Sequence, residues 1–290
     1  MVRMRPVVDI SFEVFPGRGR KGKFLNGLAR LEAENPSYIS LTYGADGEGR
    51  ARSEEQVKSL CDSAVVTNLA PHLTCAGQPR VKVKALAQSW ISKGLRSFVA
   101  LSGDAPATYP DEIKNAVELV SCLQQWGAEE VAVGCYPTGH VRSMSIDNDI
   151  AALKEKQNSG ATRAITQFFF EPEDFLRYRD RAVSSGIVIP IVPGILLVKS
   201  ADQLDRFSKR CGAPVPEWVF SQYNGIDEDD PATELLSAST AIALIQRLVR
   251  DGVDAFHLYT LNQFDSAIAI SRAVRRDPYS LCTQRHKEAA

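Results

Sequence analysis

Glu13 is the residue of this sequence best placed to act as an acid. It lies between Phe12 and Val14 in the apolar run of residues 10–15, which is typical of a β-strand. Successive strand residues face opposite sides, so Glu13 is expected on the face away from its two apolar neighbours. Partial loss of solvent there would raise the pKa of the carboxyl and keep it protonated near neutral pH. That is the property of a general acid.

The same alternation places further polar side chains at the ends of other strand-like runs. If the apolar residues face the helices, Val99 and Leu101 among them, a set of polar residues is left on the opposite face. These are Ser11, Ser40, Thr42, His72, Thr74, Ser102, Asp104, Tyr136, Gln167, His257 and Tyr259. Any one of them could be an ordinary hydrogen-bonded residue at a strand end. Two carboxylates with an amide, hydroxyls, imidazoles and phenols together indicate one polar site.

Strand-like runs alternate with helix-like segments along most of the chain. The runs are residues 10–15, 38–42, 70–74, 97–101, 130–136, 164–169, 189–194 and 255–259. Helices are expected over residues 81–91, 112–125, 217–222 and 233–248, with a start at Ser53 and ends at Gly94, Gly127, Gly160, Gly186 and Gly252. Regular alternation without a linker predicts an α/β fold, a single-domain (β/α)8 barrel, or TIM barrel, over about residues 9–274 of 1–290. Its active site would lie at the carboxyl ends of the strands.

Composition and charge exclude several classes of protein. The 34 Lys and Arg against 35 Asp and Glu leave a net charge of −1, so no overall field favours nucleic acid or an anionic membrane. No apolar stretch could span a bilayer and no secretory signal precedes the first strand, so a cytoplasmic location is expected. The 6 scattered cysteines predict reduced, mostly buried thiols, and the 4 histidines show no ligand spacing, so no metal site is expected.

Two features near the expected site could hold an anion. Lys154 and Lys156 follow the fifth strand-like run, although a solvated helix face explains them equally well. The turn Ser102-Gly103-Asp104 could offer backbone N–H groups to a phosphate. The sequence has no Gly-x-Gly-x-x-Gly and no Walker-type loop, which disfavours a Rossmann or P-loop nucleotide site.

Eight blocks of the sequence, taken in order, resemble the methylenetetrahydrofolate reductase family and in particular its bacterial catalytic domain. The blocks are residues 11–16 (SFEVFP), 40–45 (SLTYGA), 71–75 (PHLTC), 100–104 (ALSGD), 132–140 (AVGCYPTGH), 164–170 (AITQFFF), 191–195 (IVPGI) and 256–262 (FHLYTLN). Each block is weak by itself, but eight in the right order are highly specific.

The resemblance implies a barrel that binds FAD and reduces 5,10-methylenetetrahydrofolate to 5-methyltetrahydrofolate with NAD(P)H by ping-pong hydride transfer. It implies two catalytic residues: Glu13 protonates the folate N10, and Asp104 lies beside flavin and folate, where its charge can stabilise a developing cation and restrain flavin reduction. The implied flavin contacts are Thr42, His72, Ser102, Gly103, Asp104, Tyr136, His140, Asp149 and Lys156. The implied folate contacts are Gln167, Gln203, Phe207, Tyr259 and Gln263.

Three departures from the usual family pattern affect these expectations. Ser102 stands where an arginine usually clamps the flavin diphosphate, Gln263 stands where an arginine is common, and Leu197 replaces a frequent proline. Ser102 leaves a second hypothesis open, in which NAD(P)H passes hydride directly to the folate without flavin. A third is a non-catalytic, partner-dependent barrel subunit, against which the polar lumen residues argue. NADH or NADPH, the direction of the reaction, folate polyglutamate preference and a homo-oligomeric state all stay open.

Overall fold

Parallel strands form the centre of the protein, and the apolar, β-branched runs of the sequence supply them. The computed structural model describes residues 8–17, 21–44, 49–104, 109–227 and 230–275. Within these, the strands are β1 (Asp9–Val14), β2 (Ile39–Leu41), β3 (Leu69–Thr74), β4 (Ser97–Leu101), β5 (Glu130–Cys135), β6 (Arg163–Thr166), β7 (Ile191–Val192), β8 (Gly194–Leu196) and β9 (Ala255–Tyr259). Their order in the sheet is β7-β6-β5-β4-β3-β2-β1-β9-β8.

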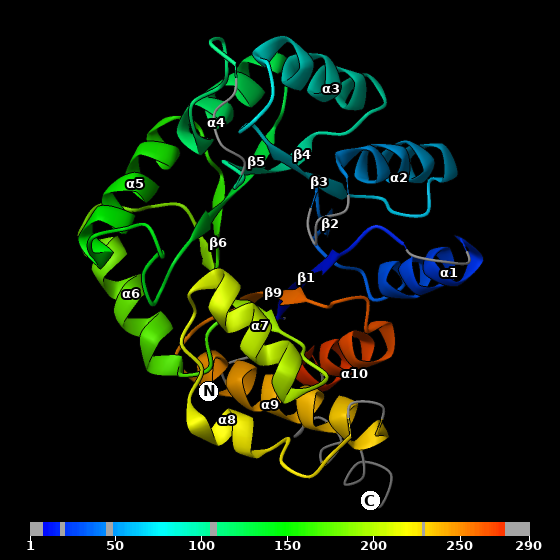
Figure 1. Ribbon diagram of the computed structural model, residues 1–290, viewed down its shortest axis with the longest axis vertical. Helices are drawn as coiled ribbons and strands as arrows, with labels where there is room; N and C mark the ends of the chain where they lie inside the picture. The colour runs from blue at the N-terminus through cyan, green and yellow to red at the C-terminus, as the bar shows by residue number, and fades with distance from the viewer. Residues whose placement is uncertain (1–7, 18–20, 45–48, 105–108, 228–229, 276–290) are drawn as a thin grey trace, which may run out of the picture.

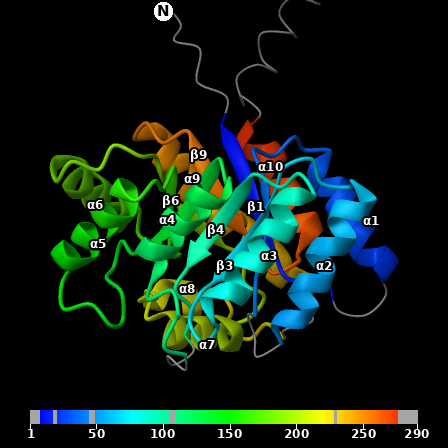
Figure 2. The ribbon, with the colours of Figure 1, turned by 90° about the horizontal axis from the view of Figure 1, so that it is seen from above.

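A ring of helices surrounds these strands (Figure 1). The helices are α1 (Lys21–Glu32), α2 (Arg50–Ser63), α3 (Arg80–Ser92), α4 (Ala116–Trp126), α5 (Ile146–Asn158), α6 (Pro172–Ser184), α7 (Ala201–Cys211), α8 (Glu217–Ser221), α9 (Pro231–Arg250) and α10 (Phe264–Arg275). Helices α7 and α8 lie at the end of the barrel opposite the start of β1 (Figure 2). They therefore cover the end where the strands finish.

The seventh strand position is divided into β7 and β8, which pair with the two strands on either side and so complete the barrel. A single strand over residues 189–194 was expected, but β7 pairs with β6 while β8 pairs with β9. Pro193 separates them because it has no N–H to give to a ladder, although its carbonyl accepts from His257 N. Since β7 and β8 are consecutive in the chain, the nine strands occupy eight positions. The predicted (β/α)8 barrel is confirmed.

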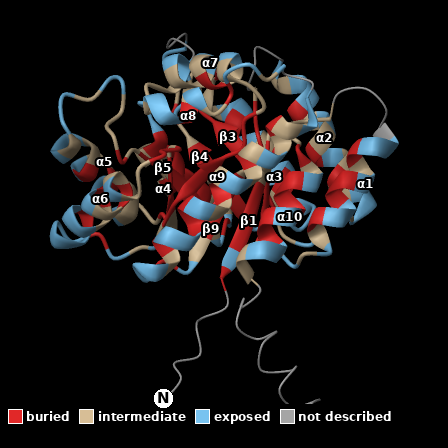
Figure 3. Ribbon diagram, turned by 90° about the horizontal axis from the view of Figure 1, so that it is seen from below, coloured by how far each residue is buried: buried red, intermediate tan, exposed pale blue. Residues whose placement is uncertain are grey.

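The core lies between the strands and the surrounding helices. Residues Phe12, Phe98 and Phe256 are almost completely buried there. Figure 3 shows buried residues along the strands and on the inner faces of the helices, with exposed residues outside. This division is the consequence of period-2 strands meeting amphipathic helices.

Two expected helix starts were wrong. Helix α2 begins at Arg50 after Gly49, and Ser53 lies inside it because its hydroxyl accepts from Gly44 N in the preceding loop. Helix α4 begins later than residue 112, at Ala116, where the Asn115 side chain caps the helix by accepting from Glu118 N.

The facing of β4 is also reversed from the expectation. Val99 packs with the residues inside the barrel and Leu101 lies against them, whereas Phe98 and Ala100 join the core beneath the helices. Every residue from Phe98 to Leu101 is apolar, so alternation gives no signal for which face is inward. Ser102 is correspondingly turned toward the helix layer, where its hydroxyl accepts from Ala116 N at 3.0 Å.

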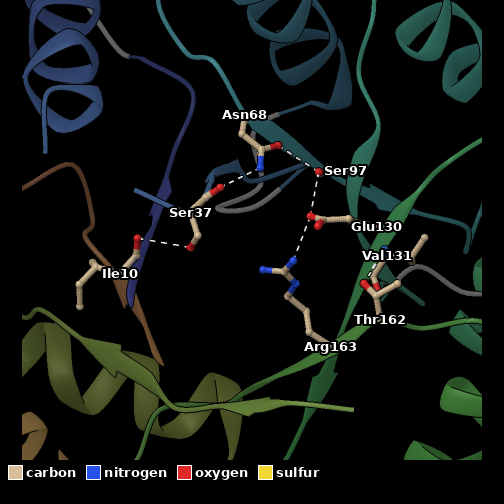
Figure 4. Close-up of polar contacts among 8 residues, drawn as sticks. All are labelled: Ile10, Ser37, Asn68, Ser97, Glu130, Val131, Thr162 and Arg163. Atoms are coloured by element: carbon tan, nitrogen blue, oxygen red, sulfur yellow. Dashed lines mark hydrogen bonds and ion pairs between the residues drawn. The ribbon is translucent and has the colours of Figure 1, made fainter. Parts of the chain in front are cut away.

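A polar cluster fills the barrel at the starting ends of the strands (Figure 4). Arg163 pairs with Glu130 at 2.9 Å, and the Ser97 hydroxyl lies 3.2 Å from the same carboxylate and 3.0 Å from Asn68 Oδ1. The amide of Asn68 donates to the carbonyl of Ser37. We call Asn68, Ser97, Glu130 and Arg163 the basal cluster. Its members are therefore linked to one another by hydrogen bonds and an ion pair.

Candidate active site

A cavity of about 820 Å³ opens at the other end of the barrel, where the strands finish. This volume is in the range of pockets that bind small ligands and cofactors. Many of the residues expected from the sequence line it, namely Glu13, Thr42, His72, Thr74, Ser102, Gly103, Asp104, Tyr136, His140, Lys156, Gln167, Phe207, His257 and Tyr259. They come from most of the strands, from the loops that follow them and from α7.

Glu13 lies on the inner wall of this cavity. Strand β1 holds it between β2 and β9, opposite Ser40 on one side and Tyr259 on the other. Its side chain is 13% exposed, and its backbone carbonyl accepts a hydrogen bond of 2.7 Å from Thr260 Oγ1. Burial raises the pKa of the carboxyl to about 8 because the charged form loses solvation. Glu13 is therefore mostly protonated at neutral pH.

His72 lies next to Glu13, with Nε2 3.4 Å from Oε2 of the carboxyl. This distance is within ion-pair range, but the atoms are not aligned for a hydrogen bond, and Nε2 has no hydrogen-bond partner among the described residues. Burial lowers the pKa of His72 to about 4, since the charged imidazolium would lose its hydration. The two groups therefore form a neutral pair at pH 7, with the proton on the carboxyl.

A second buried histidine lies in the layer below. His257 is fully buried, with Nδ1 2.7 Å from Ser11 Oγ and Nε2 3.5 Å from Ser40 Oγ. Its ring stacks on Tyr38 at 5.5 Å and meets Tyr259 edge-on at 5.3 Å. Burial lowers the pKa of His257 to about 3. The floor beneath Glu13 is thus polar, hydrogen-bonded and uncharged.

Tyr259 crosses the barrel above this layer. Its hydroxyl donates to the carbonyl of Thr166 at 2.6 Å, which joins β9 to β6 over the split seventh strand. Gly194 makes this crossing possible, because a Cβ there would lie 2.3 Å from Thr166 O and 2.4 Å from Cε2 of Tyr259. Burial raises the pKa of Tyr259 well above its usual value, so the phenol stays protonated.

A basic group enters the cavity from α5. Lys156 Nζ donates to the carbonyl of Gly134 at 2.8 Å and lies 5.9 Å from the centre of the Tyr136 ring. Burial lowers the pKa of Lys156. The Tyr136 ring meets His140 edge-on at 4.5 Å, and the backbone N–H of His140 donates to Asp149 Oδ2. The polar loop after β5 is therefore held in a defined shape.

Asp104 lies at the outer rim of the cavity. Its side chain is 90% exposed, and Arg142 Nη2 lies 3.5 Å from Oδ1. The preceding Gly103 has φ of 88°, a conformation that glycine adopts without strain. Asp104 and Glu13 thus occupy different environments, the first open to solvent and the second shielded from it.

Three of the contacts that the family resemblance implies do not line the cavity. Asp149 accepts a hydrogen bond from the backbone N–H of His140. The side chain of Gln203 accepts from Lys199 N at the start of α7. Gln263 is buried, and its amide donates to the carbonyl of Leu197. Each of these three side chains is hydrogen-bonded to a backbone group instead.

Sequence reasoning missed the arginines of the cavity, namely Arg50, Arg142 and Arg210. Arg50 could have been found, because a basic residue in the first turn of a helix opposes the helix dipole and so suggests another purpose. Its guanidinium donates to the carbonyls of Ala76 and Gly77, which ties α2 to the loop after β3. Arg142 and Arg210 give no local signal. Together with Lys156 they make the rim basic.

Comparison with known proteins identifies the family. A model of the methylenetetrahydrofolate reductase family matches residues 3–275. The protein belongs to this family. The 5,10-methylenetetrahydrofolate reductases of Pectobacterium carotovorum subsp. carotovorum and Escherichia coli (strain K12) are 37% and 36% identical to it over 265 residues, which cover 91% of this chain and 89% of each relative. The resemblance inferred from the eight sequence blocks is confirmed.

Solved structures support the fold assignment. A protein from Clostridium thermocellum that binds two copies of 5-methyl-5,6,7,8-tetrahydrofolic acid superposes with a TM-score of 0.63 at 13% identity, covering 93% of this chain and 96% of that one. At this identity the match establishes a shared fold.

The described residues offer neither a membrane-spanning helix nor a cluster of metal-binding side chains. No helix among them has the length and apolar character needed to cross a membrane. In the same part of the chain, no three or more His, Cys, Asp or Glu side chains are grouped so that they could hold a metal ion. The described cysteines are free thiols: Cys75, Cys122 and Cys135 are buried, Cys61 and Cys211 are half-buried, and Cys282 lies outside the described residues.

Proposed function

We propose that the protein is an oxidoreductase that converts 5,10-methylenetetrahydrofolate to 5-methyltetrahydrofolate with NAD(P)H and FAD. The two substrates use the cavity in turn. The observation that carries the proposal is the buried carboxyl of Glu13, whose pKa is raised to about 8 on the inner wall of a cavity of about 820 Å³. Relatives 36–37% identical carry the name of this activity.

The cavity suits a flavin nucleotide in size and chemistry. Thr42 Oγ1 is buried without a hydrogen-bond partner among the described residues, and a polar ligand would satisfy it. Arg142, Arg210 and Lys156 supply positive charge for phosphates. We assign flavin contacts to Thr42, His72, Gly103, Asp104, Tyr136, His140, Lys156 and the backbone of Ser102, with Asp149 supporting His140. Bound there, FAD would carry hydride from NAD(P)H to the folate.

In this proposal Glu13 acts as the general acid. It donates its proton to N10 of the folate, the C–N10 bond breaks, and the ring opens to an electrophilic N5 iminium. An unprotonated amine is a poor leaving group, and a positioned acid contributes a factor of about 10² to 10⁴. A carboxyl that is already protonated at neutral pH can do this without first taking a proton from solvent.

The remaining residues bind and stabilise the substrate. Gln167, Phe207 and Tyr259 line the cavity and are proposed to contact the folate ring system. Asp104, at the solvent-exposed rim, would stabilise the developing cation. Gln203 and Gln263 hold backbone in this structure, so their contact with folate would require a side-chain rearrangement.

Anaerobic stopped-flow of the two half-reactions tests the proposal. In the wild type, NAD(P)H should bleach the flavin absorption band and methylenetetrahydrofolate should restore it. Glu13→Gln should abolish reoxidation by the folate and leave reduction by NAD(P)H largely intact. Equal loss of both half-reactions would mean that Glu13 is structural. Reoxidation at the wild-type rate would rule it out as the acid.

One observation favours a second candidate function, direct hydride transfer from NAD(P)H to the folate. Ser102 stands where the family usually has an arginine, and its hydroxyl is committed to Ala116 N. Neither its size nor its orientation allows it to clamp a diphosphate. Flavin content after gel filtration separates the two candidates, because a protein that retains a flavin absorption band excludes the direct reaction.

A further inference from the structure

The side chains of His72 and Glu13 lie close together on the wall of the cavity. The two side chains come from β3 and β1, are 9% and 13% exposed, and place Nε2 3.4 Å from Oε2. Nε2 has no hydrogen-bond partner in the described part of the chain. A buried polar atom without a partner costs about 1–3 kcal/mol, so this ring nitrogen is available for a contact formed during the reaction.

The groups around this pair carry little charge at neutral pH. Glu13 and His72 are both neutral, because burial raises the pKa of the first to about 8 and lowers that of the second to about 4. The titratable groups that face them are Tyr38, His257, Tyr259 and Cys211, each held neutral by burial. The charged groups lie further away, with Arg163 beneath Tyr38 and Asp104 at the rim. The contact between His72 and Glu13 is therefore poorly screened.

We propose that His72 is a positioning residue for the acid. In this arrangement the neutral imidazole carries its hydrogen on Nε2 and donates it to Oε2 of Glu13. Oε1 is then the oxygen that carries the acidic proton toward the cavity. The inference rests on the proposed role of Glu13 as general acid, and a small rotation of the carboxyl completes the bond. Catalytic hydrogen bonds are often long before substrate binds.

The bond has a predictable effect on acidity. A donor directed at Oε2 stabilises the carboxylate that remains after proton transfer, so it lowers the pKa of Glu13 relative to a site without the donor. A hydrogen bond to a charged group contributes enough to move a pKa by about one to two pH units. Loss of His72 should therefore make Glu13 a weaker acid. A ring that only contacts flavin would leave the pKa of Glu13 unchanged.

The test is a ¹³C NMR titration of the Glu13 carboxyl in protein labelled with [δ-¹³C]glutamate, assigned by difference from Glu13→Gln. We expect a wild-type midpoint that burial raises above the ordinary 4.5 and that the His72 donor holds below about 8. His72→Leu should raise the midpoint by about one to two pH units. His72→Gln, which keeps an N–H donor, should bring it back close to the wild-type value. An unchanged or lower midpoint in His72→Leu would overturn the proposal.

A second measurement needs no substitution and covers the case in which His72→Leu fails to fold. In ¹⁵N-histidine-labelled wild type, the imidazole nitrogens of His72 should show the neutral tautomer with hydrogen on Nε2, and hydrogen on Nδ1 would contradict the inference. Neither measurement uses folate. A wild type that does not reduce folate would defeat the proposed function and leave the titration result standing, whereas an unmoved midpoint would defeat only the role of His72.

Discussion

The two ends of the barrel lumen both contain polar side chains, but the hydrogen bonding of these side chains differs between the ends. In the basal cluster, Arg163 and Glu130 pair at 2.9 Å and Ser97 and Asn68 satisfy each other. At the other end, His72 Nε2 and Thr42 Oγ1 are buried without partners among the described residues, beside a carboxyl that burial keeps protonated. The basal side chains have hydrogen-bond partners in one another, whereas two polar atoms of the cavity wall have none among the described residues.

The difference indicates which end binds a ligand. A satisfied polar cluster specifies structure and has nothing left to offer a substrate. Unsatisfied groups around a cavity reduce stability until a ligand pairs with them, and proteins retain this cost mainly at functional sites. Substitutions confined to one end of the lumen test this difference.

The largest expected effect is a difference in reaction rate between substitutions of two glutamates, one at each end of the lumen. Glu13→Gln should lower the rate of folate reduction by a factor of about 10² to 10⁴, because the acid is lost. Glu130→Gln is the matched change in the basal cluster and should lower stability modestly while changing the rate less than about twofold. Single-turnover rates and chemical denaturation of both variants check this. Equal rate losses would show that the two ends are not functionally distinct.

The second-largest effect is expected from a steric change at the cavity end. Gly194→Ala places a Cβ 2.3 Å from Thr166 O and against Tyr259, so the Tyr259 crossing must shift. We expect a loss of about 2–4 kcal/mol in the free energy of unfolding. Gly22→Ala is the control, since nothing lies within 4 Å of that Cβ and the site is in α1. It should raise stability by up to about 1 kcal/mol. A neutral Gly194→Ala would disprove the required close approach.

The dependence of stability on pH is the third test. The folded-state pKa of Glu13 is about 8, above the ordinary 4.5, so the folded protein holds a proton that the unfolded chain releases. Its contribution to stability is complete below about pH 4.5 and falls as pH rises toward 8, by at most about 1.4 kcal/mol per pH unit. As the pH rises from roughly 5.5 to 7.5, the free energy of unfolding of Glu13→Gln should increase by about 2–3 kcal/mol relative to that of the wild type. Parallel stability curves for the two proteins would refute the raised pKa.

The smallest effect is expected at the rim. Arg142 is 67% exposed, so Arg142→Gln should weaken flavin binding only about two- to fivefold, and the difference should fade at high salt. Arg177→Gln is a matched control, because that arginine is 75% exposed and does not line the cavity. Fluorescence titration of flavin at two ionic strengths provides the measurement. Identical affinities for both variants would exclude Arg142 from phosphate binding.

The sequence alone determined the barrel and most of its inward-facing residues. Apolar alternation located β1, β3, β5 and β9 closely, and it predicted that Glu13 and His72 would face away from the helices. These predictions succeeded because strand periodicity is a local property and the polar residues break an otherwise apolar pattern. For the same reason alternation failed in β4, where both faces are apolar and Val99 turned out to face inward.

Only the tertiary structure decided which of these residues meet. Closure of the barrel brings Glu13 next to His72. It also lets the Tyr259 hydroxyl donate to the carbonyl of Thr166, and the Ser102 hydroxyl accept from the first residue of α4. It also holds the side chains of Gln203 and Gln263 in hydrogen bonds to backbone, and it brings arginines from distant segments to one cavity. No local pattern encodes such contacts, because each depends on the register of strands far apart in the chain. The sequence thus specifies the chemical type of each residue. Burial in the folded barrel sets its protonation, and the register of the strands sets its partners.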